Sequence, residues 1–187
     1  ELVLKTLTQK YPEHGVLSEE GSTLELDRKY LWVCDPLDGT HNFAHGLPTA
    51  TFMLSLLEDG VPIIGLVYDP FLDRMFYAER GNGAFLNETQ IHVSEHKKLE
   101  RSIIGVARTT ETRNLYPVLQ EFDAKKVRWV KGLSIGYMGA LVAAGEFSAI
   151  IFGGKYAHDT AAIQILVEEA GGKSTDLFGY HNDTYTK

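Results

Sequence analysis

The apolar positions of the chain follow two different patterns, one before and one after about residue 95. The first part opens with helical spacing at residues 2–10 and continues with short apolar runs, separated by turn sequences such as Glu58-Asp59-Gly60. Short runs between such turns are typical of antiparallel strands. We therefore predict a strand at residues 30–34, followed by an antiparallel meander with strands at 49–57, 61–68 and 74–78.

The second part alternates between strand-like and helical patterns. Strands are predicted at residues 102–107, 127–131, 147–152 and 172–176. Helices are predicted between them, at residues 113–123, 134–144 and 160–170, with Gly145 and Gly171 as stop signals. The two patterns together predict one domain of layered sheets and helices over residues 1–187, with an antiparallel-sheet half at 1–95 and an alternating α/β half at 96–187.

Composition narrows the class of protein. The chain has 187 residues, 44% of them hydrophobic and 23% charged, which is enough for one sizeable core. A net charge of −7 without a basic run favours neither a nucleic-acid polymer nor an anionic membrane as partner. The single cysteine, Cys34, excludes an internal disulfide and fits a reducing cytoplasm. Because Cys34 lies inside a predicted strand, we expect a small buried side chain and no nucleophile.

Residues 35–43, Asp-Pro-Leu-Asp-Gly-Thr-His-Asn-Phe, carry the densest chemistry. Pro36 favours an extended Asp35 at the strand end, and the turn that follows brings Asp38 back beside it. Two adjacent carboxylates repel each other unless a cation lies between them, and a hard divalent ion suits them. Gly39 permits close approach of the backbone and Thr40 supplies a hydroxyl, which suits a phosphate. The alternative is a plain turn, since Asp-Pro and Asp-Gly pairs are common turn formers.

Two further acidic segments could complete this site. Glu19 and Glu20 precede Gly21, so that one carboxylate could face the cleft while the other faces water. Asp159 stands at the start of a predicted helix, where an N-cap is the alternative role. Either segment alone would carry no functional prediction.

Taken in order along the chain, these segments resemble the inositol monophosphatase family of magnesium-dependent phosphatases. Its two signatures, Asp-Pro-Ile/Leu-Asp-Gly-Thr-x-Asn-Phe and a later Asp-x-Ala-Ala leading to Glu-Ala-Gly-Gly, match residues 35–43 and 159–172. The resemblance implies an αβαβα sandwich of the inositol monophosphatase and fructose-1,6-bisphosphatase type, here without the N-terminal helix and the last C-terminal elements. It also implies a site between the two halves.

The resemblance further implies two or three Mg²⁺ ions. One ion would be held by Glu19, Asp35 and the carbonyl of Leu37, and a second by Asp35, Asp38 and Asp159. Inhibition by lithium and a homodimer are further expectations from the family.

Hydrolysis would then use metal-activated water. The resemblance gives the catalytic roles to Thr40, Glu19 and Asp38, with Thr40 and Glu19 orienting the water and the amides of Gly39 and Thr40 holding the phosphate. The substrate would contact Leu37, Asp38, Gly39, Thr40, Ser134 and Asp159. For Ser134, a helix cap is an equal alternative.

The predicted reaction is Mg²⁺-dependent hydrolysis of a small polyol or sugar phosphate monoester, with inositol monophosphate as one candidate. Phe152 stands where inositol-specific members carry a Glu that contacts the sugar ring, and phenylalanine cannot accept a hydrogen bond from a hydroxyl. Fructose 1,6-bisphosphate, histidinol phosphate and a 3′-phosphonucleotide therefore stay open as substrates. The alternative from a different functional class is a truncated member of the family that does not catalyse hydrolysis. His41 and His45 have the spacing of a helical zinc pair, but oxygen ligands favour magnesium.

Overall fold

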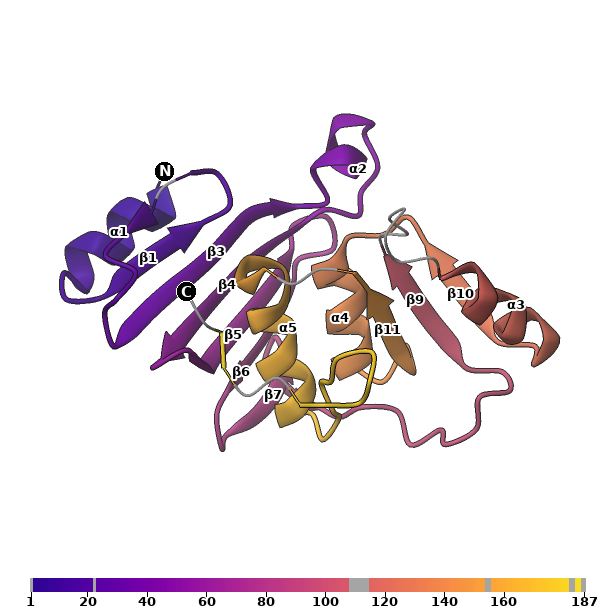
Figure 1. Ribbon diagram of the computed structural model, residues 1–187. Coiled ribbons are helices and arrows are strands. Elements are labelled where there is room, and N and C mark those ends of the chain that lie inside the picture. The colour runs from indigo at the N-terminus through magenta and orange to yellow at the C-terminus, as the bar shows by residue number, and fades with distance from the viewer. Residues whose placement is uncertain (1, 22, 108–114, 154–155, 182–183, 186–187) are drawn as a thin grey trace.

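Five layers of secondary structure make up the fold, in the order helix, sheet, helices, sheet, helix (Figure 1). The computed structural model describes residues 2–21, 23–107, 115–153, 156–181 and 184–185. Helix α1 (Leu2–Lys10) covers one face of the large sheet, while α4 (Ile135–Ala143) and α5 (Ala157–Glu169) lie between the two sheets. Helix α3 (Tyr116–Ala124) covers the outer face of the small sheet. The predicted αβαβα sandwich is confirmed.

The large sheet has eight strands in the order β2-β1-β3-β4-β5-β6-β7-β8. Strand β1 pairs parallel with β3, and all other neighbours are antiparallel. The predicted meander corresponds to β4, β5 and β6. Strands β1, β2, β7 and β8, which have two to four residues each, were not predicted. The strands span β1 Gly15–Ser18, β2 Thr23–Leu24, β3 Tyr30–Asp38, β4 Thr51–Glu58, β5 Val61–Asp69, β6 Arg74–Glu79, β7 Gly83–Leu86 and β8 Thr89–Ile91.

The small sheet is parallel, in the order β10-β9-β11, with β9 at Ile103–Ala107, β10 at Arg128–Lys131 and β11 at Ala149–Phe152. The strand predicted at residues 172–176 is wrong, because this segment has no strand conformation. There Oδ1 of Asp176 accepts hydrogen bonds from the amides of Phe178 and Tyr180. This local turn takes the place of pairing with a neighbouring strand.

Helix boundaries differ from the prediction at both of the later helices that carry site candidates. Helix α5 begins at Ala157 and is capped by Tyr156, so Asp159 lies inside its first turn and the N-cap role is wrong. Helix α4 begins at Ile135 after the N-cap Ser134. The predicted start of α3 at residue 113 lies outside the described residues, and the described helix begins at Tyr116.

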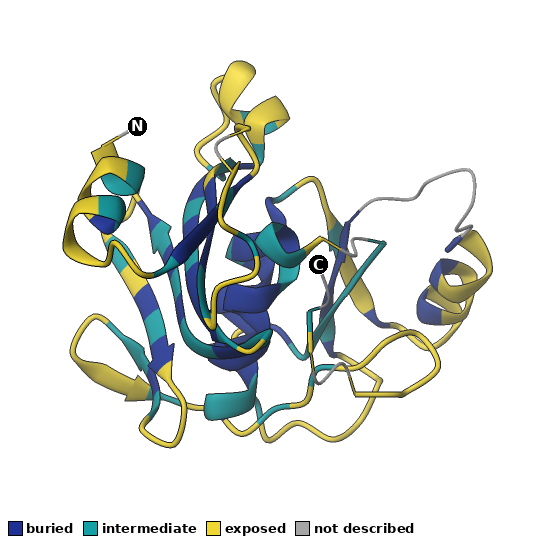
Figure 2. Ribbon diagram, turned by 60° about the vertical axis from the view of Figure 1, so that its left-hand side comes forward, coloured by how far each residue is buried: buried dark blue, intermediate teal, exposed yellow. Residues whose placement is uncertain are grey.

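The main core lies between the sheets and fixes the two inner helices (Figure 2). Helix α5 sits directly on β5 at Gly65, where an added Cβ would come within 2.6 Å of the Ala162 carbonyl oxygen. Ala161, one residue earlier, packs against Val33 and Leu57. The first turns of α5 are therefore held against β3 and β4, the strands that lead to the predicted site.

Candidate active site

Glu19 and Asp35 emerge side by side from two parallel strands. Leu17 of β1 is the register partner of Val33 of β3, and both side chains belong to the apolar cluster that contains Ala161. Beyond β1 the pairing continues, since the amide of Glu19 donates to the Cys34 carbonyl at 3.1 Å. Because side chains alternate along a strand, Glu19 and Asp35 lie two positions further on the same face of the sheet.

A β-bulge places Asp38 on that face as well. Asp35 pairs with Met53 and Asp38 with Thr51, so three steps along β3 match two steps along β4. Met53 and Thr51 are two residues apart and share a face, and their partners must do the same. Asp35 and Asp38 are only 3% and 6% exposed. Two buried carboxylates thus point toward the inner helices.

The bulge also removes the Leu37 peptide from the strand ladder. Its amide donates to Oδ1 of Asp35 at 3.0 Å, and its carbonyl accepts from Oγ1 of Thr40 at 2.9 Å. Gly39 then adopts a left-handed conformation with φ of 85°, which begins the short helix α2 (Thr40–Ala44). A Cβ at Gly39 would lie 2.8 Å from Cβ of Ser134, so only glycine lets these two segments meet.

Asp38 is held by donors from both sheet and helix. Its Oδ2 accepts from the amide of Gly136 at 2.6 Å and from Oγ1 of Thr51 at 3.0 Å. Burial raises the pKa of Asp38, although these hydrogen bonds lower it. Thr51 and Gly136 were not among the predicted site residues. Only the register of β4 and the position of Gly136, two residues after the Ser134 cap, could have indicated them.

The electrostatics of Asp35 test whether a cation fits this site. Burial raises the pKa of Asp35 to about 8, with further upward contributions from the charges of Asp38 and Glu19. The two buried carboxylates and the exposed Glu19 therefore repel one another, and a divalent cation would relieve this repulsion. The side-chain donors are oxygens, which suit Mg²⁺.

The candidate metal ligands form an open arrangement. Within the described residues, no three Asp, Glu, His or Cys side chains converge closely enough to enclose an ion on their own. An ion here would need carbonyl or water ligands besides carboxylates, and Mg²⁺ usually keeps several waters. The residues present thus fit a hydrated magnesium site. The individual ligand assignments to Glu19, Asp35, Leu37, Asp38 and Asp159 stay predictions.

Asp159 and Ser134 belong to the N-terminal ends of the two inner helices. Asp159 is 3% exposed in the first turn of α5, just before Ala161, which packs against β3. Ser134 is equally buried and caps α4, since its Oγ accepts from the amide of Tyr137 at 3.2 Å. The helix-cap alternative for Ser134 is therefore observed, and its contact with substrate stays a prediction.

Other candidates take ordinary structural roles. The rings of His41 and His45 lie 4.4 Å apart on exposed α2, and Nδ1 of His45 is bonded to the His41 carbonyl oxygen. Across the ranges that the structure describes, no third ligand joins them. Burial raises the pKa of the Cys34 thiol to about 12, so it stays protonated and unreactive, as predicted.

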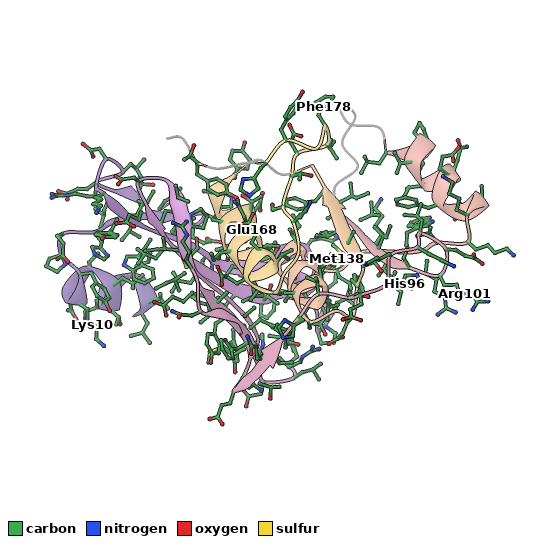
Figure 3. The ribbon with its side chains drawn as sticks, turned by 90° about the horizontal axis from the view of Figure 1, so that it is seen from below. Lys10, His96, Arg101, Met138, Glu168 and Phe178 are labelled. Carbon is green, nitrogen blue, oxygen red and sulfur yellow. The ribbon has the colours of Figure 1, made fainter. Side chains whose placement is uncertain are left out.

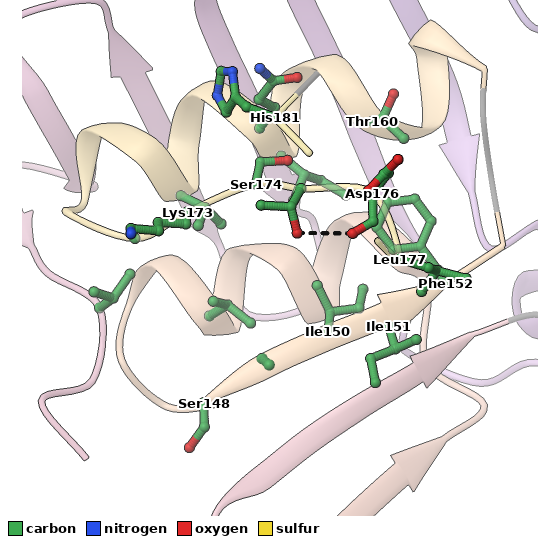
Figure 4. A pocket seen from close by; sticks show the side chains of 18 of the residues that line it. Ser148, Ile150, Ile151, Phe152, Thr160, Lys173, Ser174, Asp176, Leu177 and His181 are labelled. Carbon is green, nitrogen blue, oxygen red and sulfur yellow. Dashed lines mark hydrogen bonds between the residues drawn. The ribbon is translucent and has the colours of Figure 1, made fainter. Parts of the chain in front are cut away.

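Phe152 lies in a cavity of about 750 Å³ between β11, α5 and the segment after α5. Figure 4 shows it at one end of this cavity, near Thr160 of α5 and the turn at Asp176 and Leu177. The cavity thus begins one residue beyond Asp159. A side chain without polar atoms at this end offers a substrate apolar contact only.

Comparison with known proteins agrees with this geometry. A family model described as the inositol monophosphatase family matches residues 1–187. The chain belongs to this family. Members of the family are phosphatases, and the chain is accordingly a phosphoric monoester hydrolase.

Two curated relatives of this inositol monophosphatase family member have different functional names. The chain is 32% identical over 186 residues to the fructose-1,6-bisphosphatase/inositol-1-monophosphatase of Thermotoga maritima, covering 100% of this chain and 71% of that protein. It is also 32% identical over 186 residues to the Nus factor SuhB of Xylella fastidiosa, covering 95% and 66%. The chain therefore spans about two thirds to seven tenths of these relatives.

Solved structures of the family share the fold. The inositol monophosphatase from Anabaena superposes with a TM-score of 0.91 at 34% identity, covering 97% of this chain and 74% of that one. An IMPase/NADP phosphatase complexed with Mg²⁺ and phosphate gives a TM-score of 0.86 at 28% identity, covering 97% and 69%. Divalent metal dependence is therefore consistent with the family. None of the described helices has the length and apolar character needed to cross a bilayer.

Proposed function

We propose that this chain hydrolyses a small polyol or sugar phosphate monoester in a Mg²⁺-dependent reaction. The observation that carries the proposal is the burial of Asp35 beside Asp38 and Glu19 at the ends of β1 and β3: burial raises the pKa of Asp35 to about 8, and the two neighbouring charges raise it further. A folded protein keeps such a cluster at the cost of stability, and a bound cation offsets that cost.

Mg²⁺ at this site would supply charge neutralisation for the phosphate and a lower pKa for bound water. Glu19, Asp35, Asp38, Asp159 and the Leu37 carbonyl would hold two or three ions. The oxygen-only donor set supports this assignment, as does the Mg²⁺ in a related structure.

The protein's own groups would position the reacting atoms. The Thr40 hydroxyl, held by the Leu37 carbonyl, and the carboxylate of Glu19 would orient the attacking water. The amides that begin α2, at Gly39 and Thr40, would bind phosphate oxygens. Asp38, fixed by Gly136 and Thr51, would keep its place as charge develops on the leaving oxygen.

The substrate is the finer part of this proposal. Related structures have D-inositol-1-phosphate or NADP bound, and relatives are named for fructose 1,6-bisphosphate as well. The absence of a hydrogen-bond acceptor on the Phe152 side chain supports a substrate other than inositol phosphate. Lithium inhibition, a homodimer and a cytoplasmic location complete the proposal, on the family resemblance and the free thiol of Cys34.

A phosphate-release assay tests the function. The panel contains inositol 1-phosphate, fructose 1,6-bisphosphate, histidinol phosphate, a 3′-phosphonucleotide and NADP, each with Mg²⁺, with chelator and with lithium. Asp38→Asn should abolish release while the fold is retained. Asp59→Asn makes the same chemical change in the exposed β4–β5 turn and should leave the rate unchanged. Folded protein that releases no phosphate from any substrate would support the non-catalytic alternative.

A further inference from the structure

The charges of this acidic chain are unevenly distributed. Residues 97–131 contain nine of its 18 lysines and arginines but only four of its 25 acidic residues, a local net charge of +5 in a chain of −7. The overall charge led to the expectation of no nucleic-acid partner. That argument concerns the average surface, and a polyanion responds to local charge.

The fold brings two cationic segments of this region together. The amide of Arg101 donates to the Lys126 carbonyl at 3.4 Å, and the amide of Arg128 donates to the Ser102 carbonyl at 2.9 Å. The loop before β9 therefore lies against the turn between α3 and β10. We call the exposed cations of these two segments the basic patch: Lys97, Lys98, Arg101, Lys125, Lys126 and Arg128.

A surface depression adjoins the basic patch. The depression has a volume of about 330 Å³ and is lined by Leu99, Glu100, Ala124, Lys125 and Lys126. Arg101 stands at the outer edge of the molecule beyond β9 (Figure 3). Leu99 is 43% exposed and lines the depression together with Lys125 and Lys126, so an apolar side chain lies beside positive charge.

Most of these charges have no counter-ion. Within the part of the chain that the structure describes, Lys97, Lys98, Arg101, Lys126 and Arg128 form no ion pair, and Lys125 is 3.8 Å from the exposed Glu121. Lysines at the end of α3 could serve only to offset the helix dipole. A helix dipole does not explain Lys97, Lys98 and Arg101, which precede a strand.

Two members of the basic patch also have an unfavourable backbone conformation. Arg101 and Lys126 have φ of 65° and 57°, in the left-handed region where glycine or asparagine costs least. Lys126 directly follows the C-cap of α3, where glycine is the common residue.

An exposed aromatic residue follows the last cation of the patch in the sequence. Trp129 follows Arg128 on the edge strand β10 and is 36% exposed, with its Nε1 donating to Asp123 at 2.9 Å. Unpaired cations beside apolar and aromatic surface are typical of proteins that bind single-stranded nucleic acid, where phosphates meet the cations and bases stack on the rings. We propose that the basic patch binds the sugar-phosphate backbone of a single-stranded nucleic acid.

This surface is separate from the candidate active site. The patch lies at the amino ends of the parallel strands β9 and β10, whereas the carboxyl end of β10 at Lys131 leads to Ser134 and Asp38. Binding of a polymer would therefore leave the phosphatase site open. The proposal does not depend on the chain's being an active phosphatase.

Fluorescence anisotropy of labelled 20-nucleotide oligo-U and oligo-dT, measured between 25 and 200 mM salt, tests the proposal. Wild-type protein should bind at least one of them with an affinity that falls as salt rises. Lys97→Gln/Lys98→Gln should weaken binding about tenfold at low salt and reduce the slope of log K against log salt by about 1.4, at about 0.7 per lost contact. Lys126→Asn, chosen because asparagine tolerates positive φ, should weaken it less.

Lys5→Gln/Lys10→Gln removes the same charge from exposed positions on α1 and is the matched control. It should retain wild-type affinity and slope, and both double variants should retain the wild-type rate of phosphate release. Undetectable binding at 25 mM salt, or an equal loss in the control, would overturn the proposal. So would binding to phosphatidylserine vesicles with none to either oligonucleotide, since the surface would then suit a membrane.

Discussion

Asp38 accepts a 2.6 Å hydrogen bond from the amide of Gly136, a residue 98 positions later in the chain. This bond connects the strand that carries both buried carboxylates to the first turn of α4. Thr51 donates to the same oxygen, so Asp38 has two fixed donors from two different elements. The geometry of the site thus depends on how the inner helix docks on the large sheet.

Gly136→Ala should weaken magnesium binding. An added Cβ would lie 2.8 Å from both Oδ2 of Asp38 and Oγ1 of Thr51, and would push the carboxylate from its place. We expect the Mg²⁺ concentration for half-maximal activity to rise about tenfold or more, as for lost outer-shell support of metal ligands. Thr51→Val, which removes one donor without adding volume, should give a smaller rise. An unchanged Mg²⁺ dependence in both variants would contradict the role of Asp38 as a ligand.

Stability without metal should depend on pH through Asp35. Its folded pKa of about 8 lies above the ordinary 3.8, so between these values the folded chain holds a proton that the unfolded chain has released. The free energy of unfolding contributed by this group therefore falls as pH rises from about 4 to about 8 and is constant above that. Urea denaturation in chelator across this range measures it.

Asp35→Asn is the matched variant for that measurement. It removes the titrating charge, so its stability relative to wild type should increase from pH 4 to pH 8 in chelator. Saturating Mg²⁺ should reverse the order, because wild type gains binding energy that the variant lacks. A constant difference between the two proteins across this range would exclude Asp35 as the titrating group.

Ser134→Ala separates a helix cap from a substrate contact. Loss of the bond to the Tyr137 amide should lower stability by about 1 kcal/mol. If Ser134 acts only as a cap, the KM for the phosphate ester stays within about twofold of wild type. A large rise in KM with little change in the melting temperature would instead assign Ser134 to the substrate.

Glu169→Gln should destabilise the fold and leave metal binding unchanged. The Glu169 carboxylate, in the last position of α5, accepts from the amides of Gly81 and Gly83 at 2.9 Å each. Glutamine retains only one acceptor oxygen, and we expect a loss of about 1–2 kcal/mol by urea denaturation. A rise in the Mg²⁺ concentration for half-maximal activity would contradict this expectation, because it would show that the last turn of α5 also affects the position of Asp159 in the first turn.

Local patterns in the sequence predicted the parts of the fold that depend on local interactions. The apolar runs of β4 to β6 and the helical spacing of α1 and α4 were recognisable, because burial imposes a period on each. The prediction of a strand at residues 172–176 was wrong because the Asp176 side chain accepts hydrogen bonds from the backbone amides that follow it and forms a local turn. The start of α5 was predicted at residue 160 but lies at Ala157, so the alternative role of Asp159 as N-cap is wrong.

In the candidate site, too, local features could be predicted from the sequence and features that depend on tertiary contacts could not. Its carboxylates could be named from the sequence, since residues 35–43 form a compact motif. The β-bulge could not, because register depends on a partner strand 13 residues away from Asp38. Gly136 could not either, since its amide contributes through tertiary packing. The basic patch joins segments separated by an entire helix, and only the fold shows that their charges meet.

In the bulge, the backbone of Leu37 contributes to the site, and its side chain does not. Its amide donates to Asp35 and its carbonyl accepts from Thr40, and among substitutions of the leucine only proline removes one of these groups. Position 37 can therefore accept other residues of similar size, while Asp35 cannot. A deletion there would abolish both bonds, however conservative the remaining residues. At this point of the chain, the number of residues in the bulge is constrained more strictly than the identity of the residue at position 37.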